Sequence, residues 1–157
     1  MQKPGPVLNI ADLPVRTGSG YPEDHAKAVK GRSNVSLGNP LGVTQFGVNI
    51  TTLEPGAWSS QRHWHLNEDE LVLALEGEMV IVDENGRHQF KPGKVMGWKA
   101  NTPNAHCITN ESDKPAKFLI VGTRAEIEEA YYPDIDMHYR RDEKGPRFQR
   151  KDGSSFL

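Results

Sequence analysis

Short stretches of alternating apolar and polar residues follow one another from position 43 onward. They are rich in β-branched and aromatic residues, and they occupy 43–53, 59–65, 70–75, 78–82, 88–90, 95–99, 106–109 and 117–122. Residues that favour turns separate them, at 54–56, 76–77, 83–86, 91–93 and 110–113. About eight short strands at near-regular spacing, with almost no helical periodicity, predict an all-β antiparallel sandwich or barrel.

The two ends of the chain lack this pattern. Residues 1–42 are rich in proline and glycine, which predicts an extended arm with one or two helical turns at 24–30. After position 122, residues 124–130 fit a short helix and 126–132 fit an outer strand equally well. Residues 140–151 carry six basic and two acidic side chains, so we expect a tail that is solvated or laid on a partner subunit. The sequence thus predicts an arm at 1–42, a barrel at 43–124 and a C-terminal extension at 125–157.

The composition fits one compact domain of 157 residues. Nineteen Lys and Arg against 21 Asp and Glu give a net charge of −2, which leaves no basic excess for binding nucleic acid. The only cysteine, Cys107, excludes a disulfide within the chain and a cysteine-rich metal site. The longest strongly apolar run, 71–75, is too short to span a membrane, and the first residues lack the apolar segment of a signal peptide. We therefore expect a cytoplasmic protein with no membrane partner and no nucleic-acid partner.

Two histidines one residue apart are the first sign of chemistry. His63 and His65 would place both imidazoles on the same face of a strand, near enough to share one ion. Glu70 follows at the start of the next apolar strand, and His106 stands at the start of a later one. Together they would offer three imidazoles and one carboxylate. An isolated His-x-His pair is more often a surface feature. The spacing of the residues around it has to decide whether this pair binds a metal.

The wider spacing resembles the two motifs of the cupin superfamily. Its positions fall in the order Gly56, His63, His65, Glu70 and Gly77, then Gly97, Pro103, His106 and Asn110. Six residues, where the pattern usually has five, separate the first glycine from the first histidine. The second turn is two residues shorter than usual and has no glycine. The resemblance covers 43–122, and the segments 46–65, 121–124 and 132–136 extend it to small single-domain bacterial cupins of largely unassigned function.

This resemblance implies both a fold and a ligand set. The fold would be the cupin double-stranded β-helix, a jelly-roll-like barrel. Inside it, one divalent metal ion would be bound by His63, His65, Glu70 and His106. These ligands would leave one or two open positions on the ion, as catalytic sites do. Ligand type alone does not choose among iron, manganese, nickel, zinc and copper.

Strand alternation assigns the neighbours of these ligands. Gln61 would face the same interior as His63 and could hydrogen-bond a substrate or a metal-bound water, unless a change of register turns it outward. Trp64 lies between two ligands and would point to the opposite face. Cys107 would be turned away from the metal and is expected to be a buried, unreactive thiol.

The main functional hypothesis is a metal-dependent enzyme that acts on a small polar substrate. Isomerase or epimerase chemistry, for example on a sugar phosphate, and dioxygenase or lyase chemistry stay open, because fold analogy does not select a reaction. The alternative is a non-catalytic module that binds or senses a small ligand. We also expect a homodimer, since the two end segments would build no second core and would need another surface to lie on.

Overall fold

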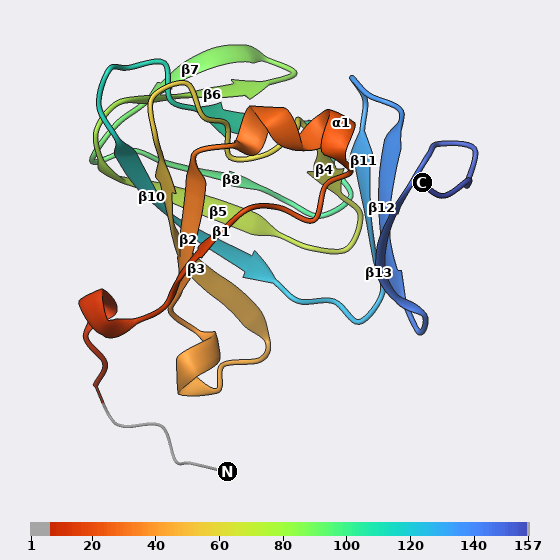
Figure 1. Cartoon of the computed structure of the whole chain (residues 1–157), viewed down its shortest axis with the longest axis horizontal. Helices are drawn as coiled ribbons and strands as arrows, with labels where there is room; N and C mark the ends of the chain where they lie inside the picture. The colour runs from red at the N-terminus through yellow and green to blue at the C-terminus, as the bar shows by residue number, and fades with distance from the viewer. Residues whose placement is uncertain (1–6, 157) are drawn as a thin grey trace.

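A computed structural model of the protein describes residues 7–156, which form three antiparallel sheets (Figure 1). The largest sheet runs in the order β1 (Val15–Thr17), β2 (Arg32–Ser36), β3 (Phe46–Leu53), β10 (Ala116–Thr123), β5 (Glu70–Glu76) and β8 (Val95–Trp98). A second sheet contains β7 (Gly86–Phe90), β6 (Met79–Asp83) and β9 (Cys107–Thr109). The third contains β13 (Gly145–Gln149), β12 (Met137–Asp142), β11 (Glu128–Tyr132) and β4 (Trp64–His65). This arrangement confirms the predicted all-β antiparallel fold.

The main core lies between the six-stranded and the three-stranded sheets. Alternation along β5 turns Val72 inward beside Phe118 of β10, and both pack in one buried cluster with Ile81 of β6 and Ile108 of β9. Each of these four side chains is at most 3% exposed. Burying such a side chain stabilises the fold by about 1.5–3 kcal/mol. The alternation that predicted the strands therefore also supplies the apolar surface that holds the sheets together.

Two of the motif positions that are not ligands hold turns. Gly77 has φ +76°, and a Cβ at this position would lie 2.9 Å from the Cβ of Ala116, so only glycine fits without displacing its neighbour. Asn110 is completely buried, and its Nδ2 donates to the carbonyl of Leu53 at 2.8 Å. The motif spacing thus reports turn geometry as well as chemistry.

The N-terminal segment is more than an extended arm. Strand β2 pairs with β3, and β1 pairs with β2, so both strands extend the main sheet. The helical turns expected at 24–30 are confirmed as α1 (Glu23–Ala26) and the 3-10 turn η2 (Lys27–Val29), and two further 3-10 turns are η1 (Ile10–Asp12) and η3 (Asn39–Leu41). The first six residues of the predicted arm, and residue 157, lie outside the described residues.

The segment after 124 is a strand meander and not a tail. β11, β12 and β13 (blue in Figure 1) pair in succession, and β11 also pairs with β4. The open choice at 124–132 is therefore resolved in favour of a strand. The tail predicted at 140–151 was wrong because its charges find partners: both terminal nitrogens of Arg147 lie 2.7 Å from the carboxylate of Asp142.

A second, smaller core lies under this meander. Ala130, Tyr132 and Met137 are buried in it, and Tyr21 and Phe148 pack against them. Tyr21 comes from the N-terminal segment, so the two ends of the chain meet here. The argument that the end segments build no second core was therefore wrong, and the homodimer that rested on it stays a prediction. The domain boundaries at 42 and 124 also stay a prediction. At each boundary, a strand on one side pairs with a strand on the other, as β2 does with β3 and β11 does with β4. Within 7–156, no helix has the length and apolar character needed to cross a bilayer.

Candidate metal centre

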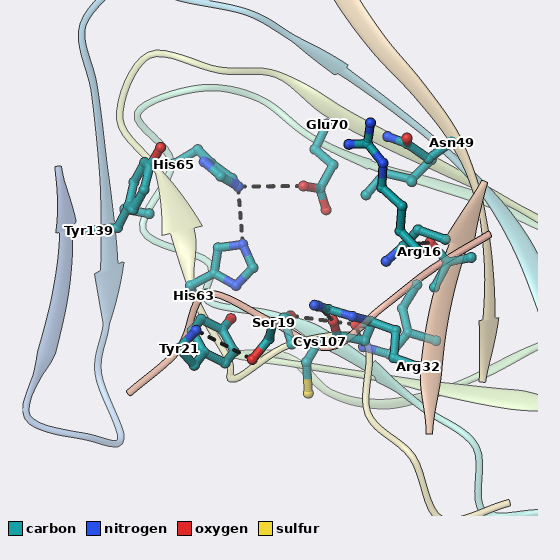
Figure 2. A pocket seen from close by; sticks show the side chains of 18 of the residues that line it. Arg16, Ser19, Tyr21, Arg32, Asn49, His63, His65, Glu70, Cys107 and Tyr139 are labelled. Carbon is teal, nitrogen blue, oxygen red and sulfur yellow. Dashed lines mark hydrogen bonds and ion pairs between the residues drawn. The ribbon is translucent and has the colours of Figure 1, made fainter. Parts of the chain in front are cut away.

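The four predicted ligands border one cavity and contact one another, and we call them the imidazole wall (His63, His65, Glu70 and His106; Figure 2 labels the first three). The backbones of His63 and His106 form an isolated antiparallel bridge, with N–H to O distances of 3.2 and 2.9 Å in the two directions. His65 lies on β4, which pairs with β11, and Glu70 is the first residue of β5. Three different strand pairings therefore position the four side chains.

The ligand atoms lie close together. Nε2 of His63 is 3.1 Å from Nε2 of His65, which is in turn 3.5 Å from Oε2 of Glu70. Nε2 of His106 is 3.1 Å from Oε1 of Glu70. One ligand atom from each of His63, His65 and Glu70 falls within 4.8 Å of the other two, so these three side chains could hold one metal ion. His106 joins them through its contact with Glu70.

Backbone carbonyls select the tautomers of two of these imidazoles. Nδ1 of His63 lies 2.8 Å from the carbonyl oxygen of Gln61, and Nδ1 of His106 lies 2.9 Å from that of Asn104. Because a carbonyl oxygen only accepts hydrogen bonds, each Nδ1 carries the hydrogen in a neutral ring and each Nε2 presents a lone pair. This is the form of imidazole that binds metals.

The donor set fits a divalent ion because acceptors face one another. The lone pair of His63 Nε2 points at His65 Nε2, and that of His106 Nε2 points at the carboxylate of Glu70. Each contact needs a proton or a cation between its two atoms. A single divalent ion could satisfy both contacts, and nitrogen and carboxylate donors are accepted by zinc, iron, manganese and nickel.

Burial and mutual contact set the charges of this wall. Burial, with the adjacent imidazoles of His65 and His106, lowers the pKa of His63 to about 3, so this ring is neutral. Burial alone would raise the pKa of Glu70, but when a proton occupies its contacts with His106 and His65, the resulting hydrogen bonds hold that pKa well below its usual range. Burial likewise opposes protonation of His65, yet its contact with Glu70 outweighs that effect and raises the pKa of the ring.

Aromatic rings limit the rotation of two of the ligands. The ring of Trp98 stacks on His106 with centroids 3.6 Å apart and planes 5° from parallel. The ring of Tyr132 stacks on His63 at 5.2 Å and 25°. Each of these imidazoles is therefore fixed by a carbonyl at Nδ1 and by a ring against its face, which leaves Nε2 aimed at the other ligands.

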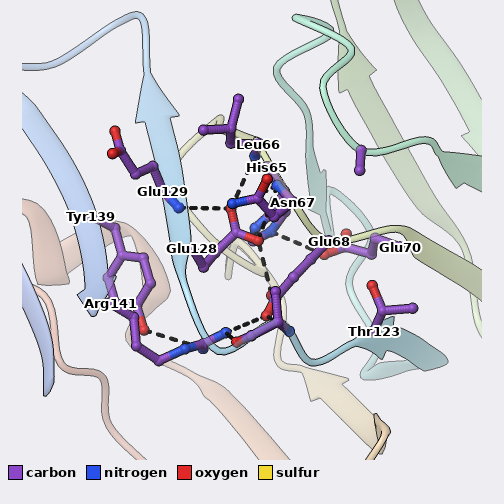
Figure 3. A network of polar contacts seen from close by, with 12 residues as sticks. His65, Leu66, Asn67, Glu68, Glu70, Thr123, Glu128, Glu129, Tyr139 and Arg141 are labelled. Atoms are coloured by element: carbon purple, nitrogen blue, oxygen red, sulfur yellow. Dashed lines mark hydrogen bonds and ion pairs between the residues drawn. The ribbon is translucent and has the colours of Figure 1, made fainter. Parts of the chain in front are cut away.

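A buried polar network holds the turn that follows His65 and so supports this residue (Figure 3). The carboxylate of Glu128 is completely buried and accepts hydrogen bonds from the backbone N–H groups of Leu66 and Asn67, at 3.0 and 3.1 Å. Glu68 pairs with Arg141, and its Oε2 lies 3.9 Å from Nδ1 of His65. Sequence reasoning missed this network, because a glutamate on β11 carries no local sign that it will cap a turn after β4.

The imidazole wall opens onto a cavity of about 720 Å³. Hydroxyl, amide and guanidinium groups supply much of the lining, among them Arg16, Arg32, Asn34, Asn49, Thr51 and Tyr139. A cavity of this size and polarity suits a small substrate that carries many oxygen atoms. Sequence reasoning did not find these residues, although Arg32, Asn34 and Ser36 repeat with the period of a strand.

The structure does not bring the side chain of Gln61 to this site. Residues 59–62 form a bend, so strand alternation does not hold there, and Nε2 of Gln61 donates to the carbonyl of His25 at 2.9 Å. Its backbone carbonyl, in contrast, holds the ring of His63. A contact between the Gln61 amide and a bound ligand stays a prediction.

Two other neighbours lie as alternation predicts. Trp64 faces away from the site and stacks on Tyr131, with centroids 4.6 Å apart. Cys107 borders the cavity, but its sulfur points away from His63 and Glu70 in Figure 2. Burial raises the pKa of the Cys107 thiol to about 11, which keeps it protonated.

Comparison with known proteins shows the same fold in enzymes. The chain is similar to the crystal structure of a sugar phosphate isomerase of the cupin superfamily from Silicibacter pomeroyi, with 46% identity, 97% of each chain covered and a TM-score of 0.92. It is also similar to a candidate sugar phosphate isomerase from Acidithiobacillus ferrooxidans, with 27% identity, 80% of each chain covered and a TM-score of 0.72.

A more distant structure shows the fold alone. A predicted oxalate decarboxylase from Thermotoga maritima shares 21% identity over 76% of this chain and 99% of its own, with a TM-score of 0.61. A search of curated proteins finds no match. The family model of the cupin domain matches residues 49–122. With the near full-length similarity to the Silicibacter pomeroyi protein, this match shows that the chain belongs to the cupin superfamily.

Proposed function

We propose that this cupin is a metal-dependent isomerase of small sugar phosphates. The observation that carries the proposal is the convergence of three imidazoles and one carboxylate on the wall of a polar cavity of about 720 Å³. One divalent ion would be held there by His63, His65, Glu70 and His106. The two similar proteins with the highest identities quoted above are a sugar phosphate isomerase and a candidate for the same activity, which supports this reaction over the dioxygenase, decarboxylase and lyase reactions of other cupins.

The chemistry divides between the ion and the chain. A divalent ion held by these residues would supply Lewis acidity toward a carbonyl or enediol oxygen of the substrate. Glu70 is committed to the ligand set by its contacts with His65 and His106, so it is not a free base. The phenol of Tyr132 borders the cavity beside His63, and burial raises its pKa well above the usual value. Tyr132 therefore keeps its proton at neutral pH.

The reaction is tested by incubating the metal-loaded protein with aldose and ketose phosphates of three to six carbons in deuterium oxide. We expect interconversion of one such pair, with solvent deuterium appearing at the carbon that exchanges its proton. Chelation and His63→Ala should both abolish it, while His88→Ala should not, because His88 lies outside the cavity and pairs with Asp83. Consumption of dioxygen with iron bound would instead indicate an oxygenase. Binding without turnover would indicate the non-catalytic module.

The remaining expectations about partners belong to this proposal. We propose a homodimer, which would cover part of the apolar outer face of β5 and β8, where Leu71 is 44% and Val95 61% exposed. Sedimentation should then give about 35 kDa, twice the 17.5 kDa of one chain. A particle of the single-chain mass at micromolar concentration would contradict the dimer. A cytoplasmic location also remains part of the proposal, because a single cysteine forms no disulfide within the chain.

A further inference from the structure

The side of the cavity built by β1, β2 and β3 carries guanidinium and amide groups. Its inward side chains on β2 are Arg32, Asn34 and Ser36, which alternate with outward positions. The register places Arg16 of β1 opposite Asn34, and Asn49 of β3 opposite Ser36. All five side chains border the cavity. We call this surface the arginine wall.

Arg32 is a partly buried cation without a carboxylate partner. Its terminal nitrogens donate to the backbone carbonyls of Ser59 and Gly18. Its Nε is buried and has no hydrogen-bond partner in the part of the chain that the structure describes. Burial lowers the pKa of Arg32, which is the cost of holding a cation away from water without a counter-charge. An arginine guanidinium remains charged at neutral pH, so Arg32 favours an anion at this place.

Arg16 is a second cation on the same wall. It is exposed, and among residues 7–156 it forms no hydrogen bond through its side chain and no ion pair. In Figure 2, Arg16, Arg32 and Asn49 lie on one side of the cavity, and His63 and His65 lie on the other. In this view the two cations lie across the cavity from His63 and His65.

No carboxylate lining the cavity neutralises these two arginines. In the described chain the only acidic residues that border it are Glu68 and Glu70. Glu68 pairs with Arg141, and Glu70 contacts His65 and His106. The arginine wall thus keeps two uncompensated positive charges, with the amides of Asn34 and Asn49 beside them.

We propose that Arg16 and Arg32, helped by the amides of Asn34 and Asn49, form a subsite for the phosphate group of the substrate. Two guanidinium groups and two amides offer enough donors for the several oxygens of a phosphate monoester, and guanidinium geometry matches such an anion. The phosphate would bind on β1 to β3, so that the carbonyl end of the substrate faces the imidazole wall. This assignment rests on the proposed isomerase function for the identity of the substrate, but the anion site itself does not need the reaction.

The subsite is tested with inorganic phosphate as the probe and metal-free, full-length protein, so that phosphate has no ion to bind. Calorimetry should detect phosphate binding to the parent chain. Arg16→Gln and Arg32→Lys should each weaken it by about tenfold or more, since each loses charge or a bidentate contact to a dianion. Arg16→Gln is the decisive variant, because it disturbs no described contact within the protein.

Two control variants make the result specific. Arg87→Gln removes an exposed guanidinium that pairs with Glu111 outside the cavity, and it should leave phosphate affinity unchanged. His63→Ala should also leave it unchanged, because the subsite lies on the other wall. Unfolding curves and metal affinity that match the parent would confirm that Arg16→Gln leaves the fold and the imidazole wall intact.

The possible failures are distinguishable. No phosphate binding by the parent, equal binding by Arg16→Gln, or binding of acetate as tight as that of phosphate would overturn the subsite. None of these results would by itself overturn the isomerase, whose test is turnover. Phosphate binding that depends on Arg16 and Arg32 without any turnover of sugar phosphates would support the subsite and contradict the proposed function.

Discussion

The two walls of the cavity differ in how firmly the surrounding structure holds their side chains. On the imidazole wall, the ring of His106 is held by a carbonyl at Nδ1 and by the plane of Trp98, and the ring of His63 is held by a carbonyl and Tyr132. On the arginine wall, Arg16 belongs to a three-residue edge strand, and its side chain forms no hydrogen bond or ion pair with the other described residues. Binding a metal requires fixed directions between several donors, whereas attracting a phosphate requires charge and spare N–H groups. The side chains are therefore held most firmly where the directions of the donor atoms decide the chemistry.

The largest expected effect comes from breaking the imidazole wall. Replacing any one of His63, His65, Glu70 or His106 by alanine should lower metal affinity at least tenfold, because each removes a ligand. Equilibrium dialysis followed by elemental analysis measures this, and circular dichroism checks that the strands remain. Full metal content in His106→Ala would reduce the site to the triad of His63, His65 and Glu70, whose ligand atoms already lie within 4.8 Å of one another.

Two histidines outside the cavity serve as internal controls for this series. His88 pairs with Asp83, and His138 pairs with Glu129, so their replacement by alanine should leave metal affinity as in the parent. Parent-like metal binding by all four ligand variants, or no metal binding by the parent, would contradict the metal site and favour a ligand-binding module.

A smaller effect is expected from the support behind His65. Glu128→Gln removes the buried charge that accepts the N–H groups of Leu66 and Asn67, and it should lower the free energy of unfolding by about 2 kcal/mol. Metal affinity should fall less than when a ligand is removed. Urea titration measures the first change. The matched control, Glu126→Gln, alters an exposed carboxylate and should stay within about 0.5 kcal/mol of the parent.

The stacking on His106 should contribute less again. Trp98→Leu removes the ring that lies 3.6 Å from the imidazole, so metal affinity should fall by about threefold to tenfold. Trp64→Leu changes a tryptophan on β4 whose side chain faces away from the site and stacks on Tyr131. This variant should leave metal affinity unchanged. Equal losses in both variants would show that the ring acts through general stability and not through the position of His106.

The smallest effect is expected on the arginine wall. Asn49→Ala removes one amide beside Arg16 and Arg32 and should weaken phosphate binding by about threefold, since the lost donor is uncharged and both cations remain. Calorimetry on the metal-free protein measures it. Asn9→Ala, which alters an exposed residue outside the cavity, should change nothing. A loss as large as that caused by Arg16→Gln would mean that hydrogen bonding, and not charge, dominates this wall.

The sequence predicted the parts of the molecule that follow simple periodicity. The strand expected at 70–75 is β5 at Glu70–Glu76, and the one at 117–122 is β10 at Ala116–Thr123, because their inward residues are apolar and alternate. The spacing of His63, His65 and Glu70 also predicted their convergence, since two residues along a strand and a return to the next strand are local geometry.

Other parts followed from pairings that local patterns do not encode. Strand β2 was missed because its inward residues, Arg32, Asn34 and Ser36, line a polar cavity and so give no apolar alternation. The hairpin of β12 and β13 was expected to be a tail, since ion pairs such as Arg147 with Asp142 form only after the strands pair. Gln61 was placed by alternation, which does not hold at the bend of residues 59–62.

The pairing of β4 with β11 has a consequence for how the protein is made. His65 lies opposite Ala130, and the turn after it is capped by Glu128, which comes 62 positions after Leu66 in the chain. A ribosome that has just added Glu70 has synthesised three of the four candidate ligands, but the strand that holds His65 in place has not yet been translated. We expect the nascent chain to bind metal weakly until β11 emerges, so that metal loading follows folding and the mature site, not the growing chain, selects the ion.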